Sequence, residues 1–359
     1  GVLGHFEGVA YGQKFKLNEN ITLRFTDVGH LLGSASIEIW ATEGDEQRKI
    51  VFSGDIGNKN KPLIRDPQYI SDGDYVVMES TYGNRYHKKG EDHVVGLARI
   101  IQQTLDRQGN VVIPAFALGR TQEVLYIRHI KEEKLVTGHD GFQVYVDSPL
   151  AVEATHVFKQ NMVECYDEET KALVERGINP IDFPGLKLSV TSEESKNINF
   201  DMTPKVIISA AGMCDAGRIR HHLKHNLWRE ECSVVFAGYQ AEGTLGRLLQ
   251  DGAPAVKIFG EEIDVKAHIE TLDGISGHAD RDGLLTWAAA FEQKPKYVFV
   301  VHGNDESCES LTDALNTQLG LTAKAPYSGS EFDLIKGVWI KETEPVPVEA
   351  ETQATRKAT

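Results

Sequence analysis

Five residues that can bind a metal or move a proton each follow a short apolar run of the chain. They are His30, Asp55, Glu79, His278 and His302. The apolar runs are typical of buried strands, so each polar residue is predicted to lie where a strand ends and a loop begins. In open α/β sheets, functional groups gather at the carboxyl ends of the strands. Histidine and aspartate brought together there suit zinc or a similar divalent metal, and the pattern favours a metal-dependent hydrolase.

The elements that must position these residues are alternating strands and helices, which is typical of an α/β protein. The first runs, at residues 23–25, 50–52 and 75–78, precede His30, Asp55 and Glu79. Two later runs, at 269–272 and 297–301, precede His278 and His302. Further strands are expected at 111–113, 144–146, 206–208 and 234–237, and helices at 94–105, 121–130, 282–291 and 306–319. The central strands predict a second α/β layer.

The chemical residues form an early cluster and a late cluster, separated by about half of the chain. With 359 residues, the chain exceeds the usual size of one hydrophobic core, so two domains are expected. If both clusters build one site, the middle of the chain must be an insertion. We therefore predict a catalytic domain from residues 1–83 and 260–340, an insertion at 84–259, and a disordered tail at 341–359.

Composition narrows the class of protein. Apolar residues make up 41% and charged residues 25%, as in ordinary globular proteins. The net charge of −15 argues against a general nucleic-acid-binding surface, although it does not exclude a local site. No apolar run approaches the roughly 18 to 20 residues of a membrane span, so no membrane partner is expected. The four cysteines lie far apart, which argues against disulfides and thiolate metal sites and favours a cytoplasmic protein.

Each candidate also has a structural interpretation when it is taken alone. His30 stands between glycines, and a single histidine is more often structural than a ligand. Asp55 could bond to its own backbone in an Asx-turn, and Glu79 could cap a helix or form a surface salt bridge. However, an ionised carboxylate at the end of an apolar strand is costly without a partner, and a histidine is a natural one.

Two positively charged features are candidate phosphate sites. The segment 216–229 is predicted to be a helix, and Arg218 and His222 share one of its faces with His221, His225 and Arg229. Arg120 follows a strand at the start of another predicted helix. A helix N-terminus beside arginines suits phosphate, although a solvated basic face is the alternative.

The chain resembles the β-CASP branch of the metallo-β-lactamase superfamily, and specifically its RNA-processing nucleases, such as the cleavage subunit of the polyadenylation machinery and its bacterial and archaeal relatives. The resemblance runs from about residue 11 to about residue 329. It implies an α/β fold, namely a metallo-β-lactamase αββα sandwich with an inserted α/β β-CASP domain. The motifs that carry it, in order, are GHLLGSA, FSGDIG, ESTYG, PAFALGRTQE, DSPLA, SAAGMCDAGRIRHHLKHNLW, GYQAEGTLGR, SGHAD and VVHG.

The resemblance implies a role for each candidate residue in a zinc-dependent ribonuclease. His30 would bind the first zinc, Asp55 would bridge two Zn²⁺ ions, and His302 would bind the second. His278 would be the general acid and Glu79 its partner. A histidine at position 302 resembles the RNA-acting group. The residues expected to contact single-stranded RNA are Arg120, Arg218 and His222.

One motif of the family, H-x-H-x-D-H, is absent from the chain. The expectation is that the N-terminal part of the sandwich is missing and that this chain alone is inactive. The alternatives are a non-catalytic scaffold in an RNA-processing complex and a DNA nuclease of the same branch. A small-ester hydrolase is least favoured, because the long insertion has no obvious use on a small substrate. Endonuclease or 5′-exonuclease action stays open, and a homodimer is an assembly that the sequence allows.

Overall fold

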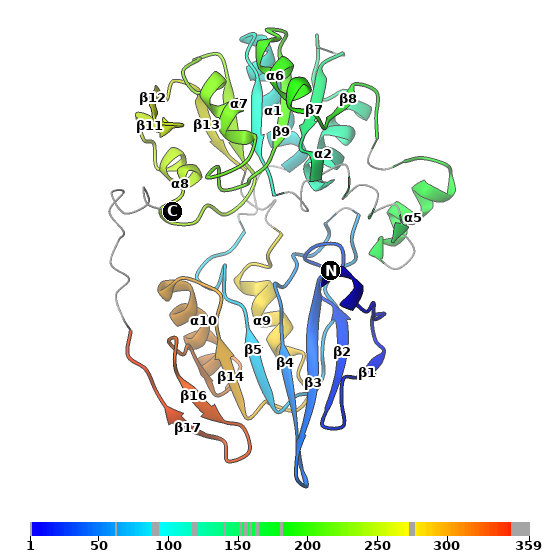
Figure 1. Ribbon diagram of the computed structural model, residues 1–359, viewed down its shortest axis with the longest axis vertical. Coiled ribbons are helices and arrows are strands. Elements are labelled where there is room, and N and C mark those ends of the chain that lie inside the picture. Colours follow the sequence, from blue (N-terminus) through cyan, green and yellow to red (C-terminus); the bar gives the residue numbers. More distant parts are fainter. Residues whose placement is uncertain are drawn as a thin grey trace.

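The protein folds into two α/β bodies that lie one above the other in Figure 1. The lower body is built on a seven-stranded sheet and the upper body on a six-stranded sheet. The computed structural model describes residues 2–61, 63–87, 93–116, 121–139, 141–150, 153, 157, 160–161, 165–179, 182–272 and 277–345. No helix in these ranges is long and apolar enough to cross a membrane.

The seven-stranded sheet begins as an antiparallel meander and becomes parallel at its centre. Its strands in spatial order are β1 (Lys14–Lys16), β2 (Ile21–Asp27), β3 (Ala35–Glu43), β4 (Glu46–Phe52), β5 (Tyr75–Met78), β14 (Tyr297–Val300) and β15 (Ala323–Lys324). Strands β4, β5 and β14 are parallel neighbours. Their carboxyl ends therefore meet at one edge of the sheet, as the apolar runs predicted.

One face of this sheet packs on helices α9 (Arg281–Ala289) and α10 (Asp305–Thr317). Alternate strand residues such as Val51, Val76 and Val298 meet Trp287 and Leu311 there, and all of them are buried. The opposite face is also apolar, and a row across four strands consists of Phe25, Ile37, Phe52 and Val77. The hairpin of β16 (Glu331–Asp333) and β17 (Val338–Lys341) packs aromatic rings on one end of that face.

The six-stranded sheet is parallel throughout and is the second α/β layer that the sequence predicted. Its strands in spatial order are β13 (His268–Thr271), β10 (Ser233–Phe236), β6 (Val111–Pro114), β9 (Lys205–Ser209), β7 (Gln143–Asp147) and β8 (Leu186–Ser189). Strands β6, β9 and β10 are buried at every position, as expected for a parallel sheet covered on both faces.

Helices cover both faces of this second sheet. On one side α1 (His93–Asp106) and α2 (Thr121–Glu132) contribute Leu97, Ile101 and Ile127 to the core. On the other side α7 (Ile219–Asn226) and α8 (Leu245–Gln250) pack against the sheet. The remaining elements in the described part of the chain are the 3-10 helix η1 (Val2–His5), α5 (Glu168–Glu175), α6 (Ser192–Phe200), β11 (Ala255–Ile258) and β12 (Glu261–Asp264).

The structure corrects two expected boundaries. β13 pairs with β10, so the insertion continues through Thr271 and does not end near residue 259. An isolated apolar run does not reveal which sheet it will join, which explains the error. The expected disordered tail also begins too early, because Lys341 ends β17 and the Thr343 N–H donates to Ser330 Oγ at 3.1 Å. Residues 346–359 of that tail lie outside the described residues.

Candidate active site

The carboxyl ends of the central strands bring the predicted residues together. Glu79 directly follows β5, Asp55 lies three residues beyond β4, and His302 lies two residues beyond β14. His30 lies in the loop between β2 and β3, next to Gly29, which has a φ of +64°. A Cβ atom at Gly29 would lie 2.7 Å from the Arg65 carbonyl oxygen, so this turn requires glycine.

Three of the predicted residues form a group that could hold a metal ion. One ligand atom from each of His30, Asp55 and His278 lies within 4.8 Å of the others. Burial, together with the neighbouring charges of His278 and Lys61, lowers the pKa of His30 to about 3. The imidazole is therefore neutral and keeps a lone pair. Its Nδ1 is buried and has no hydrogen-bond partner among the described residues. Two imidazoles and a carboxylate with such an orphan nitrogen fit a divalent metal of the zinc type.

Buried Glu79 pairs with His278 of this group, whose side chain is partly buried. His278 Nδ1 lies 3.0 Å from Glu79 Oε1 and 3.2 Å from Oε2. Burial favours a higher pKa for Glu79, which is 2% exposed, but hydrogen bonds from His278, Thr81 and the Ile56 N–H hold that pKa below its usual value. The carboxylate is ionised and can only accept, so Nδ1 carries a proton and Nε2 is directed elsewhere.

His302 approaches the Asp55 carboxylate oxygen that is not the one nearest His30. Its Nδ1 is 3.5 Å from Asp55 Oδ1, and its ring centroid is 6.1 Å from that of His278. The backbone of His302 has a φ of +56°, and the Thr81 hydroxyl donates to its carbonyl oxygen at 3.2 Å. His302 is therefore a neighbour of the three-residue group without belonging to it, and its role as a metal ligand stays a prediction.

Lys61 is a buried residue of the site that the sequence did not reveal. Its Nζ donates to the carbonyl oxygens of His30 at 3.1 Å and Gly277 at 2.9 Å, and the residue is 7% exposed. The Asn58 N–H also donates to Gly277, at 3.0 Å. These bonds join the loops that carry His30, Asp55 and His278. A lysine in a polar segment is typical of a surface loop, so no sequence signal distinguishes it.

The structure places the three residues expected to contact RNA in different environments. His222 is fully buried, with Nε2 2.7 Å from Asp147 Oδ2 and Nδ1 2.8 Å from Asn199 Oδ1. It cannot contact RNA in this conformation, which corrects the expectation. Arg218 donates to Asp147 at 2.7 Å and to the Val190 carbonyl oxygen at 2.7 Å. Arg120 lies outside the described residues.

The residue that organises this network is Asp147, at the end of β7. Burial favours a higher pKa for Asp147, but hydrogen bonds from His222 and Ser195 outweigh it and lower the pKa to about 2. Asp147 is therefore a buried carboxylate whose charge is balanced by Arg218. The predicted basic helix face is thus partly an internal ion-pair network.

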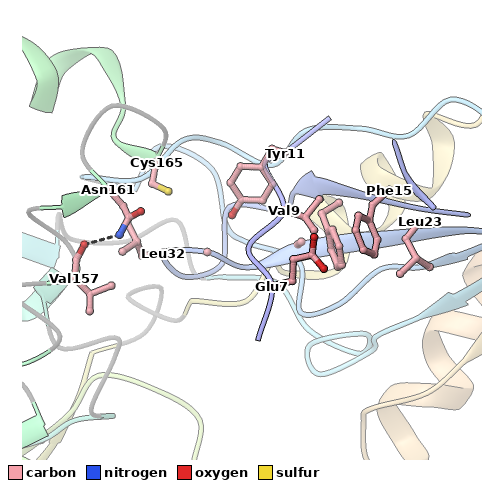
Figure 2. Close-up of a pocket in the computed structure, with 12 residues that line it drawn as sticks. Glu7, Val9, Tyr11, Phe15, Leu23, Leu32, Val157, Asn161 and Cys165 are labelled. Atoms are coloured by element: carbon pink, nitrogen blue, oxygen red, sulfur yellow. Dashed lines mark hydrogen bonds between the residues drawn. The ribbon is translucent and has the colours of Figure 1, made fainter. Parts of the chain in front are cut away.

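A cavity of about 450 Å³ is lined by residues of the seven-stranded sheet and by residues of the insertion. Figure 2 shows Tyr11, Phe15 and Leu23 on the side of the seven-stranded sheet, with Asn161 and Cys165 of the insertion opposite. Leu32, from the loop that carries His30, also lines it. Nearby, the Asp167 N–H donates to the Leu63 carbonyl oxygen at 2.9 Å, so the two bodies are in direct contact here.

Comparisons with known proteins agree with this arrangement. Residues 121–249 match the family model of the Beta-Casp domain, and residues 262–326 match that of the Zn-dependent metallo-hydrolase RNA specificity domain. Ribonuclease TTHA0252 of Thermus thermophilus is 37% identical over 86% of this chain and 68% of its own length. An RNase J-like protein of Methanocaldococcus jannaschii is 31% identical over 87% of this chain and 70% of its own.

A further relative is transcription termination factor FttA of Thermococcus kodakarensis, which is 31% identical over 90% of this chain. The match covers 50% of that protein, so the chain spans about half the length of this relative.

Proposed function

Since the chain belongs to the β-CASP family of metallo-β-lactamase-fold RNA nucleases, we propose that its site hydrolyses RNA phosphodiester bonds with the help of bound zinc. The observation that carries this proposal is that the His278 imidazole, held by Glu79, lies next to the two side chains assigned to the metal, His30 and Asp55. A metal-ligand group beside a positioned proton donor is the minimum that a metal-assisted hydrolysis requires.

We assign the metal-binding side chains as follows. His30 and Asp55 would hold one ion, and Asp55 and His302 would face a second, since both histidines lie within 3.9 Å of the Asp55 carboxylate. Zinc at such a site supplies an activated water near neutral pH and offsets charge on phosphoryl oxygens. Lys61 would maintain the geometry by holding the loops of His30 and Gly277 together.

The role of His278 would be proton transfer. Its Nδ1 proton is engaged by Glu79, which leaves Nε2 to carry the proton that moves. Protonation of the departing ribose 3′ oxygen would leave a 5′-phosphate on the downstream product. The nearby Glu79 carboxylate fixes the orientation of the imidazole, as a positioned general acid requires.

The test is zinc content together with RNA cleavage by the protein expressed from its complete reading frame, with single-stranded RNA and DNA of matched sequence as substrates. We expect two zinc ions per chain and cleavage of the RNA in preference to the DNA. Little zinc and no cleavage of either substrate would refute the proposal and favour a non-catalytic scaffold. Equal cleavage of the DNA would refute the assignment to RNA.

A further inference from the structure

Phe116 is an exposed aromatic side chain at the end of a strand that is otherwise buried. It lies two residues beyond β6, whose four residues are all buried, yet Phe116 is 52% exposed. The Ala115 N–H donates to the Ser209 carbonyl oxygen at 2.9 Å, so the β6–β9 pairing continues up to the residue before Phe116. The exposed ring therefore directly follows the last paired residue at the carboxyl edge of the second sheet.

One side of the Phe116 ring is seated on Gly212. A Cβ atom at Gly212 would lie 2.9 Å from two atoms of the ring, so only glycine allows this approach. The Gly212 carbonyl oxygen accepts from Nε2 of buried Gln240 at 3.0 Å. This bond fixes the loop after β9 to the loop after β10. The ring is thus supported from one side, and its exposed surface can receive another planar group.

The edge that carries Phe116 faces the candidate active site. Tyr239 precedes Gln240 in the loop after β10, which is the strand next to β6. Its ring centroid lies 6.4 Å from that of Tyr82, and the Tyr82 centroid lies 6.3 Å from that of His278. The guanidinium of exposed Arg85 lies 5.5 Å from the Tyr82 ring. A chain of aromatic contacts therefore links this edge to His278, with an exposed cation beside it.

We propose that the exposed side of Phe116 stacks one unpaired nucleobase of an RNA strand bound at the active site. This inference rests on the proposed function and adds a selectivity to it. Aromatic rings bind single strands by stacking on bases, and every base has a surface that can stack. The bases of a duplex are already stacked on one another and cannot reach the ring. Phe116 therefore favours single-stranded over double-stranded RNA without reading its sequence.

The test measures single-turnover cleavage of an unstructured RNA at increasing concentrations of the complete protein. Phe116→Ala should raise the half-saturating concentration by about 5- to 150-fold, the range that loss of one stacked base produces, and should affect the maximal rate less. Phe116→Trp should retain tight binding, whereas Phe116→Leu should behave like Phe116→Ala because leucine is apolar but not planar. The control is Phe200→Ala on α6, where the ring is 71% exposed and far from these contacts in the sequence; it should leave the curve unchanged.

Single abasic nucleotides placed along the RNA provide the second measurement. One position should weaken binding to the wild type and have no effect on Phe116→Ala. An unchanged half-saturating concentration for Phe116→Ala, or wild-type binding by Phe116→Leu, would overturn the stacking role while leaving the proposed function intact. If the wild type cleaves no RNA, the proposed function fails. Binding of the same RNAs to the wild type and to the Phe116 variants, measured by fluorescence anisotropy, then tests the stacking role separately.

Discussion

Replacing Glu79 by glutamine should slow RNA cleavage without removing the metal. The Glu79 carboxylate accepts from the Ile56 N–H at 2.5 Å, the Thr81 N–H at 3.2 Å and His278 Nδ1 at 3.0 Å. A glutamine amide has one oxygen for these donors and must turn its NH₂ toward another donor. The Glu79→Gln variant therefore loses the negative charge next to His278, and it no longer holds the imidazole in its present orientation.

The size of the effect follows from these bonds. A hydrogen bond to a charged group contributes about 1.5–3 kcal/mol, so its loss in the transition state should reduce the single-turnover rate by roughly 10- to 150-fold. His278→Ala removes the acid itself and should cost about 10²- to 10⁴-fold. Zinc content, measured by elemental analysis, should stay the same for both variants if His278 acts as the acid.

A matched control is Glu46→Gln on β4, because this carboxylate pairs with Arg48 and is 56% exposed. It should cleave at the wild-type rate. Wild-type rates for Glu79→Gln and His278→Ala would refute the acid assignment. Loss of one zinc in His278→Ala would instead make His278 a ligand, in keeping with its place in the three-residue group.

Three further outcomes follow from the structure. Asp55→Ala should lower the zinc content, because Asp55 faces both His30 and His302, and unchanged zinc would count against its central role. Lys61→Met should weaken zinc binding by about tenfold, because Lys61 holds the loops that carry the metal ligands. Lys59→Met, in the same loop, is the control and should leave zinc affinity unchanged. Equal zinc affinities of the two variants in a chelator competition would refute the positioning role of Lys61. Asp147→Asn should lower the free energy of unfolding, measured by urea denaturation, by about 3 kcal/mol. The substitution removes the buried charge that pairs with Arg218 and His222. The contribution of Asp147 to stability should also depend on pH. Its pKa of about 2 in the folded protein lies below the ordinary value of 3.8, so the unfolded chain binds more protons between these two values. That part of the stability should therefore decline as the pH falls from about 4 to 2, and this decline should be absent in Asp147→Asn.

The sequence by itself predicted the edge of the sheet on which the chemistry lies. Apolar runs report buried strands, and a polar residue just after such a run lies at its end. Because β4, β5 and β14 are parallel neighbours, Asp55, Glu79 and His302 necessarily converge. The order of the sequence motifs predicted the β-CASP family, and the comparisons with known proteins confirm this family.

The tertiary structure alone decided which partners those residues have. Its spacing predicted that His222 lies on a basic helix face, but His222 is buried and hydrogen-bonds to Asp147, which lies 75 positions earlier in the sequence. The apolar run before His278 joins the second sheet, and Lys61, in a polar segment, joins two ligand loops. The physical reason is common to all three: periodicity and local composition report whether a residue is buried by its own element, whereas pairing between distant segments depends on how the two sheets pack.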